Sequence, residues 1–172
     1  MCTGNICRSP TAERLTTSYA ARSEMPDLIA SSAGTRAVIG HPIHHDAAAV
    51  LQQLGGDASN FAARQLTAKI ASGADLVVTM TKAHRDAVLE LAPNKLHKTF
   101  TLIEAARIVA ECKAKTIEDL STLRPQLAAG AMLDIDDPIG QDLEVFSRVG
   151  SQIAELLPPV LELCRSSECP DR

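Results

Sequence analysis

The order of segments in this 172-residue chain predicts an α/β protein, a parallel sheet covered by helices on both faces. Short apolar runs with few charges, typical of strands buried on both sides, occur at 28–32, 73–80 and 99–101. A segment with helical spacing of its apolar residues follows each run. The length, with 45% hydrophobic and 22% charged residues, fits one globular unit, so we expect a single domain over residues 1–172.

The ends of the predicted helices are marked by capping and breaking residues. Helices are expected at 9–22, 46–54, 82–91, 103–111, 117–127 and 143–164, with loops at 40–42 and 130–141. Ser9 suits an N-cap and Pro10 the first helical position. Gly55 suits the end of the second helix, and Pro93 stops the third. The Pro158-Pro159 pair predicts a bend in the last helix.

The first residues of the chain carry the most chemical information. They read Cys2-Thr3-Gly4-Asn5-Ile6-Cys7-Arg8-Ser9-Pro10. A thiolate is a strong nucleophile that needs nearby positive potential, and the Arg8 guanidinium matches two oxygens of a phosphate. The intervening residues are enough to wrap backbone N–H groups around one oxyanion, helped by the permissive backbones of Gly4 and Asn5. We therefore predict a phosphate-binding loop formed by Thr3, Gly4, Asn5, Ile6, Cys7 and Arg8.

This string resembles the active-site loop of the low-molecular-weight protein tyrosine phosphatase family. The resemblance implies that Cys2 attacks phosphorus, that Arg8 binds the equatorial oxygens, and that Ser9 hydrogen-bonds the sulfur. It also implies that Asn5 holds the shape of the loop and that Ser32, in a Ser-Ala-Gly-Thr segment, supports it. The implied fold is a three-layer α/β/α arrangement with a four-stranded parallel sheet, or a three-stranded one without the first strand. The phosphate-binding loop then lies at the carboxyl edge of the sheet.

An aspartate-rich loop is expected to supply the proton that cleavage of a phosphate ester requires. Asp134, Asp136 and Asp137 precede Pro138, and in the family the general acid stands directly before a proline, which indicates Asp137. Crowding by the two neighbouring carboxylates would raise the pKa of Asp137, because like charges disfavour ionisation. The alternative is a solvated acidic turn between two helices.

The chain departs from the family pattern in three places. Only Met1 precedes Cys2, where the family has a central strand, so we expect a start upstream and, for these 172 residues alone, low stability and weak activity. Ile139 follows Pro138 where many members have an aromatic residue, and the loop at 36–40 has none, which predicts a weaker grip on a phenyl ring. Phe61 stands where many relatives have a histidine that supports Asn5, so Asn5 needs another partner.

Two further functional readings stay open. A thiol-dependent arsenate reductase shares the loop but needs additional cysteines, and Cys112 stands alone in the middle of the chain. A non-catalytic phosphate-binding relic would bind the anion without turnover. Ile6 favours the phosphotyrosine branch over the phosphoarginine branch, in which a threonine stands at this position.

Cofactors and metals are not expected. His41-Pro42-Ile43-His44-His45-Asp46 is typical of a loop and a first helical turn, and no second ligand cluster matches it. Cys7 is either a redox partner of Cys2 or a packed thiol. Cys112, Cys164 and Cys169 have no assigned role. An exposed helix face is expected for Lys82, His84, Arg85 and Asp86.

The expected partners are a phosphorylated protein or a small aryl phosphate. The net charge of −4 argues against general affinity for nucleic acid or anionic membranes. Five cysteines without a regular framework, and no segment resembling a signal peptide or membrane span, favour a cytoplasmic protein. We expect a monomer or a weak dimer.

Overall fold

The computed structural model describes residues 1–128 and 134–165. Its helices are α1 (Arg8–Arg22), α2 (His45–Gln53), α3 (Ala68–Ser72), α4 (Lys82–Leu91), α5 (Leu102–Cys112), α6 (Ile117–Leu123) and α7 (Leu143–Glu162). The strands are β1 (Val77–Thr79) and β2 (Thr99–Thr101), and two 3₁₀ turns are η1 (Pro93–Lys98) and η2 (Arg124–Gln126). The predicted helices are confirmed to within a few residues, whereas α3 and η1 were not predicted.

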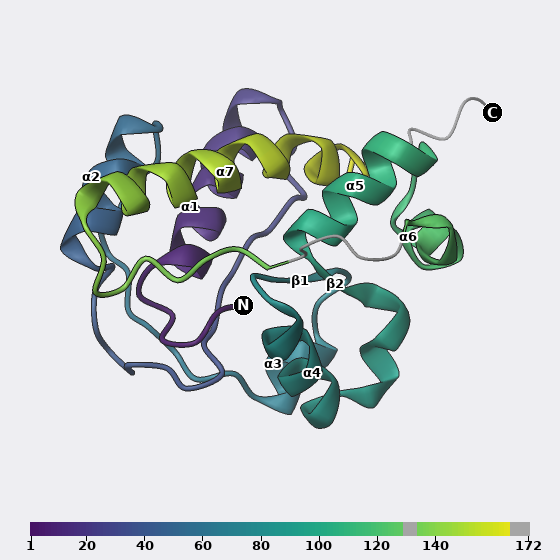
Figure 1. Ribbon diagram of the computed structural model, residues 1–172, viewed down its shortest axis with the longest axis horizontal. Helices are drawn as coiled ribbons and strands as arrows, with labels where there is room; N and C mark the ends of the chain where they lie inside the picture. The colour runs from purple at the N-terminus through teal and green to yellow at the C-terminus, as the bar shows by residue number, and fades with distance from the viewer. Residues whose placement is uncertain (129–133, 166–172) are drawn as a thin grey trace.

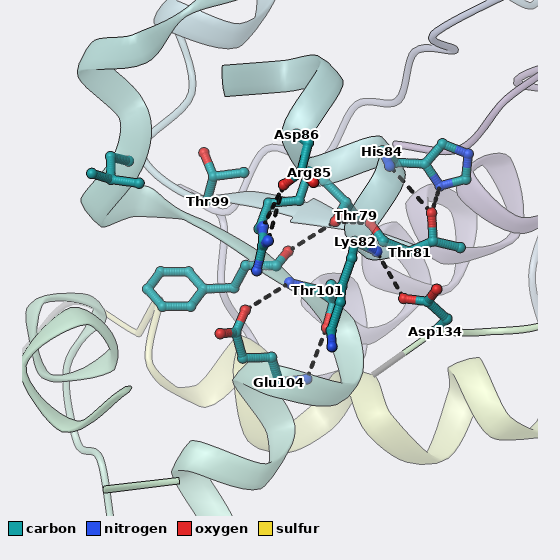
Figure 2. Close-up of polar contacts among 12 residues, drawn as sticks. Thr79, Thr81, Lys82, His84, Arg85, Asp86, Thr99, Thr101, Glu104 and Asp134 are labelled. Atoms are coloured by element: carbon teal, nitrogen blue, oxygen red, sulfur yellow. Dashed lines mark hydrogen bonds and ion pairs between the residues drawn. The ribbon is translucent and has the colours of Figure 1, made fainter. Parts of the chain in front are cut away.

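Side-chain capping explains where most helices begin. The residues before α3, α4, α5, α6 and α7 are Thr67, Thr81, Thr101, Thr116 and Asp142, and each accepts a hydrogen bond from a backbone N–H of its helix. Thr101 and Glu104 also form a reciprocal capping box, which is visible in Figure 2. Each cap satisfies a donor that the first helical turn leaves open. At the other end of α2, Gly55 takes the left-handed conformation with φ 85°, as its position in the sequence predicted.

The sheet is parallel, as predicted, but shorter than expected. β1 pairs with β2 through Val77↔Thr99, Val78↔Phe100 and Thr79↔Thr101. On the other side of β1, the backbone nitrogen of Met1 donates to Val78 O and Met80 N–H donates to Met1 O. Single parallel bridges Cys2↔Gly34 and Gly34↔Gln65 continue the row. The expectation of four or three strands is corrected, because in the described part of the chain only β1 and β2 form a continuous ladder.

The strand predicted at 28–32 is wrong. The nearest parallel pairing is at Gly34, two residues beyond this segment, and Ile29 is 89% exposed. A strand is stabilised by a neighbour that pairs with it along its length, and among the described residues none does so beside 28–32. Of the predicted loop at 130–141, residues 134–141 are loop, and the rest lies outside the described residues.

The helices lie on both faces of the strand pair. Figure 1 shows α3 and α4 on one side, with α5 and the group formed by α1, α2 and α7 on the other. Phe100 of β2 is fully buried between these layers. The buried face of α7, which covers α1, α2 and α5, consists of Phe146, Val149, Gly150, Ile153, Leu157, Val160 and Leu161. In the described segments no helix has the length and apolarity that a membrane span requires.

Replacing Gly150 by alanine is predicted to destabilise the protein, although alanine is the better helix former. A Cβ at this position would lie 2.5 Å from Val50 Cγ1 and 3.3 Å from Leu54 Cδ1, and the branched Val50 side chain is stiff. We expect Gly150→Ala to lower the free energy of unfolding by about 1–3 kcal/mol. The Val50→Ala/Gly150→Ala double variant should lose less than the sum of the single variants in urea titrations; simple additivity would contradict the close approach.

Candidate active site

The loop from Cys2 to Cys7 runs directly into α1. The helix begins at Arg8, and Thr11 N–H donates to the Cys7 carbonyl. Ser9 and Pro10 therefore lie inside the first turn, so the prediction of Ser9 as N-cap and Pro10 as first residue is wrong. The Ser9 hydroxyl is engaged with the loop instead of capping the helix. The first turn leaves backbone N–H groups without intrahelical partners beside the loop, which favours an anion there.

The loop carbonyls point outward and are held by the segments around them. The carbonyl oxygens of Cys2, Thr3, Gly4 and Ile6 accept hydrogen bonds from the N–H groups of Thr35, Arg36, Val38 and His44 at 2.9, 3.0, 2.9 and 2.7 Å, respectively. Within the described part of the chain, the N–H groups of residues 3–7 donate to no protein acceptor. A loop whose carbonyls are satisfied on its outer side and whose N–H groups stay available forms an anion-binding nest.

The left-handed residue of the loop is Asn5, with φ 56°, and not Gly4. A Cβ at Gly4 would make only ordinary contacts, 3.4 Å or more from the nearest side chain. The glycine that the loop requires is Gly34, which lies directly beneath it. A Cβ on Gly34 would lie 2.4 Å from the Thr3 carbonyl oxygen and 3.0 Å from the Asn5 nitrogen. The sequence analysis credited the permissive backbones of both Gly4 and Asn5, and of these two residues Asn5 takes the left-handed conformation. It assigned no role to Gly34.

Asn5 is fully buried and holds the loop through three partners. Its Nδ2 donates to Ser9 Oγ at 3.0 Å and to Ser32 Oγ at 2.7 Å, while its Oδ1 accepts the Arg64 N–H at 2.8 Å. The other partner that Asn5 needs, since Phe61 stands where many relatives have a histidine, is thus the Arg64 backbone. These contacts tie the loop to α1 and to the segments that contain Ser32 and Arg64, as expected for a buried polar group.

The direction of this network orients the Ser9 hydroxyl toward the thiol. Because Asn5 Nδ2 donates to both serine oxygens, each serine keeps its own hydrogen for another acceptor. Ser32 donates to the Glu13 carboxylate at 2.7 Å. Ser9 Oγ lies 3.0 Å from Cys2 Sγ, so its hydrogen points at the sulfur. A donor in this position stabilises a thiolate relative to a thiol.

Arg8 is buried at the edge of the loop, with 3% of its surface exposed. Its Nη1 donates to the Ile135 carbonyl at 2.9 Å, and its Nη2 forms an ion pair with Asp137 Oδ2. Its buried Nε has no hydrogen-bond partner among the described residues. A buried guanidinium N–H normally has an acceptor, so an anion in the loop would complete its hydrogen bonds.

The three aspartates of the loop at 134–141, which we call the acid loop, have different surroundings. Asp134 accepts the Lys82 N–H at 2.7 Å, and exposed Asp136 lies 3.4 Å from Arg148. Asp137 is the one that reaches Arg8, and its side chain is 48% exposed. Each of the three carboxylates therefore has a partner of its own. Pro138 after Asp137 is buried and fixes this end of the loop.

His84 belongs to the site, although the sequence placed it on an exposed helix face. His84 is 7% exposed, and its Nε2 lies 2.8 Å from Thr3 Oγ1. Asp86 of the same helix is exposed, as expected. Burial, reinforced by the nearby Arg8 charge, lowers the pKa of His84 to about 4, so the ring is neutral at neutral pH. The signal available in the sequence was the spacing of His84 and Val88, one turn apart on the buried face of α4.

The remaining thiols and histidines have structural surroundings. Cys7 is buried, and burial, with a further contribution from nearby Cys2, raises its pKa to about 12, so it stays protonated. Cys112 and Cys164 are half-buried free thiols, and Cys169 lies outside the described residues. His44 Nδ1 accepts the Asp46 N–H as an N-cap of α2, and neighbouring His45 is exposed. One potential metal-ligand atom from each of His44, His45 and Asp46 lies within 4.8 Å of the other two, but His44 Nδ1 already accepts a hydrogen bond from the Asp46 N–H.

The fold and the site together define a class of protein: an α/β domain in which a cysteine opens a loop with available backbone N–H groups at the start of a helix. Residues 1–115 match the family described as low molecular weight phosphotyrosine protein phosphatase. The chain belongs to this family, as its first loop indicated.

Individual relatives agree with this assignment. The chain is 36% identical over 99 residues to the probable low molecular weight protein-tyrosine-phosphatase AmsI of Erwinia amylovora, an alignment that covers 58% of this chain and 65% of AmsI. In sequence it thus spans just under two thirds of this curated relative. The solved low molecular weight protein tyrosine phosphatase of T. tengcongensis superposes with a TM-score of 0.73, 30% identity and 94% coverage of both chains. The YwlE arginine phosphatase of Geobacillus stearothermophilus gives 0.71 and 29%, covering 94% of this chain and 87% of its own.

Gly34→Ala is predicted to be the most damaging small substitution around the loop. The new Cβ meets backbone atoms of Thr3 and Asn5, which cannot move without displacing the loop. We expect the free energy of unfolding to fall by about 3 kcal/mol, measured by chemical denaturation. Gly4→Ala, whose Cβ meets only side-chain atoms, is the matched control and should change stability by less than about 1 kcal/mol. Equal losses in the two variants would contradict the close approach.

Proposed function

We propose that this protein is a cysteine-dependent phosphomonoester hydrolase, a protein-tyrosine phosphatase of the low-molecular-weight type. The observation that carries the proposal is the convergence of one thiol, a row of available backbone N–H groups and a buried arginine whose Nε has no partner in the part of the chain that the structure describes. These are the groups that bind three equatorial oxygens of a phosphoryl group while a sulfur stands in line with the leaving oxygen.

In the first step, the Cys2 thiolate attacks phosphorus and the bond from phosphorus to the ester oxygen breaks. The N–H groups of residues 3–8 and the Arg8 guanidinium bind the equatorial oxygens. The Ser9 hydroxyl hydrogen-bonds the sulfur and stabilises its negative charge before attack. Asp137 gives its proton to the departing oxygen, so an alcohol or phenol leaves. Its contact with Arg8 supports this role, because Arg8 is the residue proposed to bind the phosphoryl oxygens.

In the second step, water hydrolyses the phosphocysteine. Asp137, now ionised, takes a proton from the water as its oxygen attacks phosphorus, and the bond from phosphorus to sulfur breaks. Cys2 departs as a thiolate, which the Ser9 hydroxyl again stabilises. The products are inorganic phosphate and the enzyme in its starting form, so the cycle needs no metal or redox cofactor.

Among the described residues, the side chains around the site are suited to an aryl or peptidyl phosphate, but they do not form an aromatic contact that would hold a phenyl ring tightly. Val38, Ile39 and Ile139 are exposed aliphatic side chains on the loops that flank the phosphate loop. Ile6 lies within the loop itself and offers no hydroxyl to a guanidinium group, which argues against phosphoarginine although an arginine phosphatase is among the structural relatives. The proposed substrates are phosphorylated proteins and small aryl phosphates. The free thiols also support our proposal of a cytoplasmic location.

Cys2→Ser is predicted to abolish hydrolysis of p-nitrophenyl phosphate, because serine lacks a stabilised anion at neutral pH. Turnover should fall by at least about 1,000-fold, measured at mildly acidic pH without added metal. The variant should keep its affinity for phosphate, which calorimetry would report. Residual turnover within tenfold of the parent would overturn the mechanism.

Asp137→Asn is predicted to slow the hydrolysis of phosphate esters, and to slow it more when the leaving group is more basic. Loss of the acid should cost about 100-fold for a phenyl phosphate and far less for an activated aryl phosphate, which departs without a proton. Asp136→Asn is the matched control, since that carboxylate lies beside Arg148 on the surface, and we expect kcat within about twofold of the parent. A larger loss in Asp136→Asn would shift the assignment by one residue.

A further inference from the structure

We propose that His84 is a positioning residue that holds Thr3, the first residue of the phosphate loop after the nucleophile, against the N-terminus of α4. This inference rests on the proposed function but concerns a helix distant in the sequence from the catalytic loop. The imidazole lies between two threonines: Nε2 is 2.8 Å from Thr3 Oγ1, and Nδ1 is 2.9 Å from Thr81 Oγ1. Figure 2 shows the Thr81 side of this bridge.

The hydrogen bonds assign one tautomer to the ring. Thr81 Oγ1 accepts the backbone N–H of His84 as the N-cap of α4, so the Thr81 hydrogen is free to donate to Nδ1. Nε2 then carries the ring proton and donates to Thr3 Oγ1. The opposite tautomer would leave the Thr81 hydrogen without an acceptor among the described contacts. The chain Thr81 to His84 to Thr3 thus has a fixed direction.

Residues at the N-terminus of α4 and directly before it also hold the acid loop. Lys82 N–H donates to Asp134 Oδ1 at 2.7 Å, as Figure 2 shows, and Met80 O accepts the Ile135 N–H at 2.8 Å. Ile135 O in turn accepts from Arg8. Residues 80–84, which we call the α4 anchor, therefore contact the nucleophile side of the site through a side chain and the acid side through the backbone.

In this arrangement we do not expect His84 to act as a general acid or base. Both ring nitrogens are engaged with threonine hydroxyls, and the residue is buried. Its effect on catalysis runs through Thr3, whose N–H is the first in the row that binds the phosphoryl oxygens. Loss of the bridge should therefore weaken binding of the oxyanion and of the transition state together, because both use the same N–H groups.

Two conservative variants distinguish the two ends of the bridge. His84→Gln places an amide nitrogen where Nε2 stood and keeps the contact with Thr3, whereas His84→Asn reaches Thr81 alone. We expect His84→Gln to stay within about threefold of the parent in kcat/KM, and His84→Asn to lose about tenfold. The inhibition constant of inorganic phosphate should rise by a similar factor in His84→Asn. Melting temperatures of both variants report whether the fold is kept.

Thr3→Val removes the other partner without changing the shape of the side chain. It should reproduce the loss seen in His84→Asn, and the Thr3→Val/His84→Asn double variant should be no worse than either single variant. Additive losses would overturn the bridge. The proposal would also be wrong if His84→Asn and His84→Gln both had the activity of the parent. The same holds if the two variants lost activity equally and only in proportion to the fall in their melting temperatures.

The outcome can be separated from that of the proposed function. If the parent shows no hydrolysis that depends on Cys2, the proposed function fails. Calorimetric affinity for inorganic phosphate then still tests the bridge in the parent and the same four variants, because it reports the geometry of the loop without turnover. If the parent hydrolyses p-nitrophenyl phosphate and His84→Asn binds phosphate as the parent does, the positioning role alone is wrong.

Discussion

The site depends on one constraint: backbone N–H groups can converge on an anion only if the carbonyls of the same peptides are satisfied elsewhere. The residues after Gly34 meet this requirement by donating to the loop from outside, and His44 does so at the far end. Gly34 itself has no Cβ, which allows the two backbones to approach this closely. The surrounding segments thus support the backbone of the loop from outside, in addition to the contacts that its own Asn5 makes.

Side chains then give this backbone its chemistry. Asn5 fixes the direction of two hydroxyls, so that the Ser9 hydrogen faces the sulfur and the Ser32 hydrogen faces Glu13. A satisfied buried network of this kind has a single arrangement, which fixes the position of the Ser9 hydroxyl beside the Cys2 sulfur. The α4 anchor extends the same principle, since it contacts the loop through His84 and the acid loop through backbone groups.

Much of the fold could be predicted because its signals are local. Helical spacing, threonine and aspartate caps, and breakers such as Pro93 act within a few residues of where they stand, and the helices follow them closely. The strand expected at 28–32 failed for the opposite reason. Strand formation depends on a partner elsewhere in the chain, and apolar composition cannot report whether that partner is present.

By itself, the sequence determined the parallel α/β class, the family and the identity of the residues that converge, because Cys2 through Arg8 form one contiguous string. Only the tertiary structure decided how these residues are supported. It removed the expected helix cap at Ser9, whose hydroxyl lies beside the Cys2 sulfur as the family resemblance implied, gave Asn5 the Arg64 backbone as partner, and brought His84 to Thr3 across 81 positions. Such contacts depend on where distant backbones pass one another, which local residue patterns do not encode.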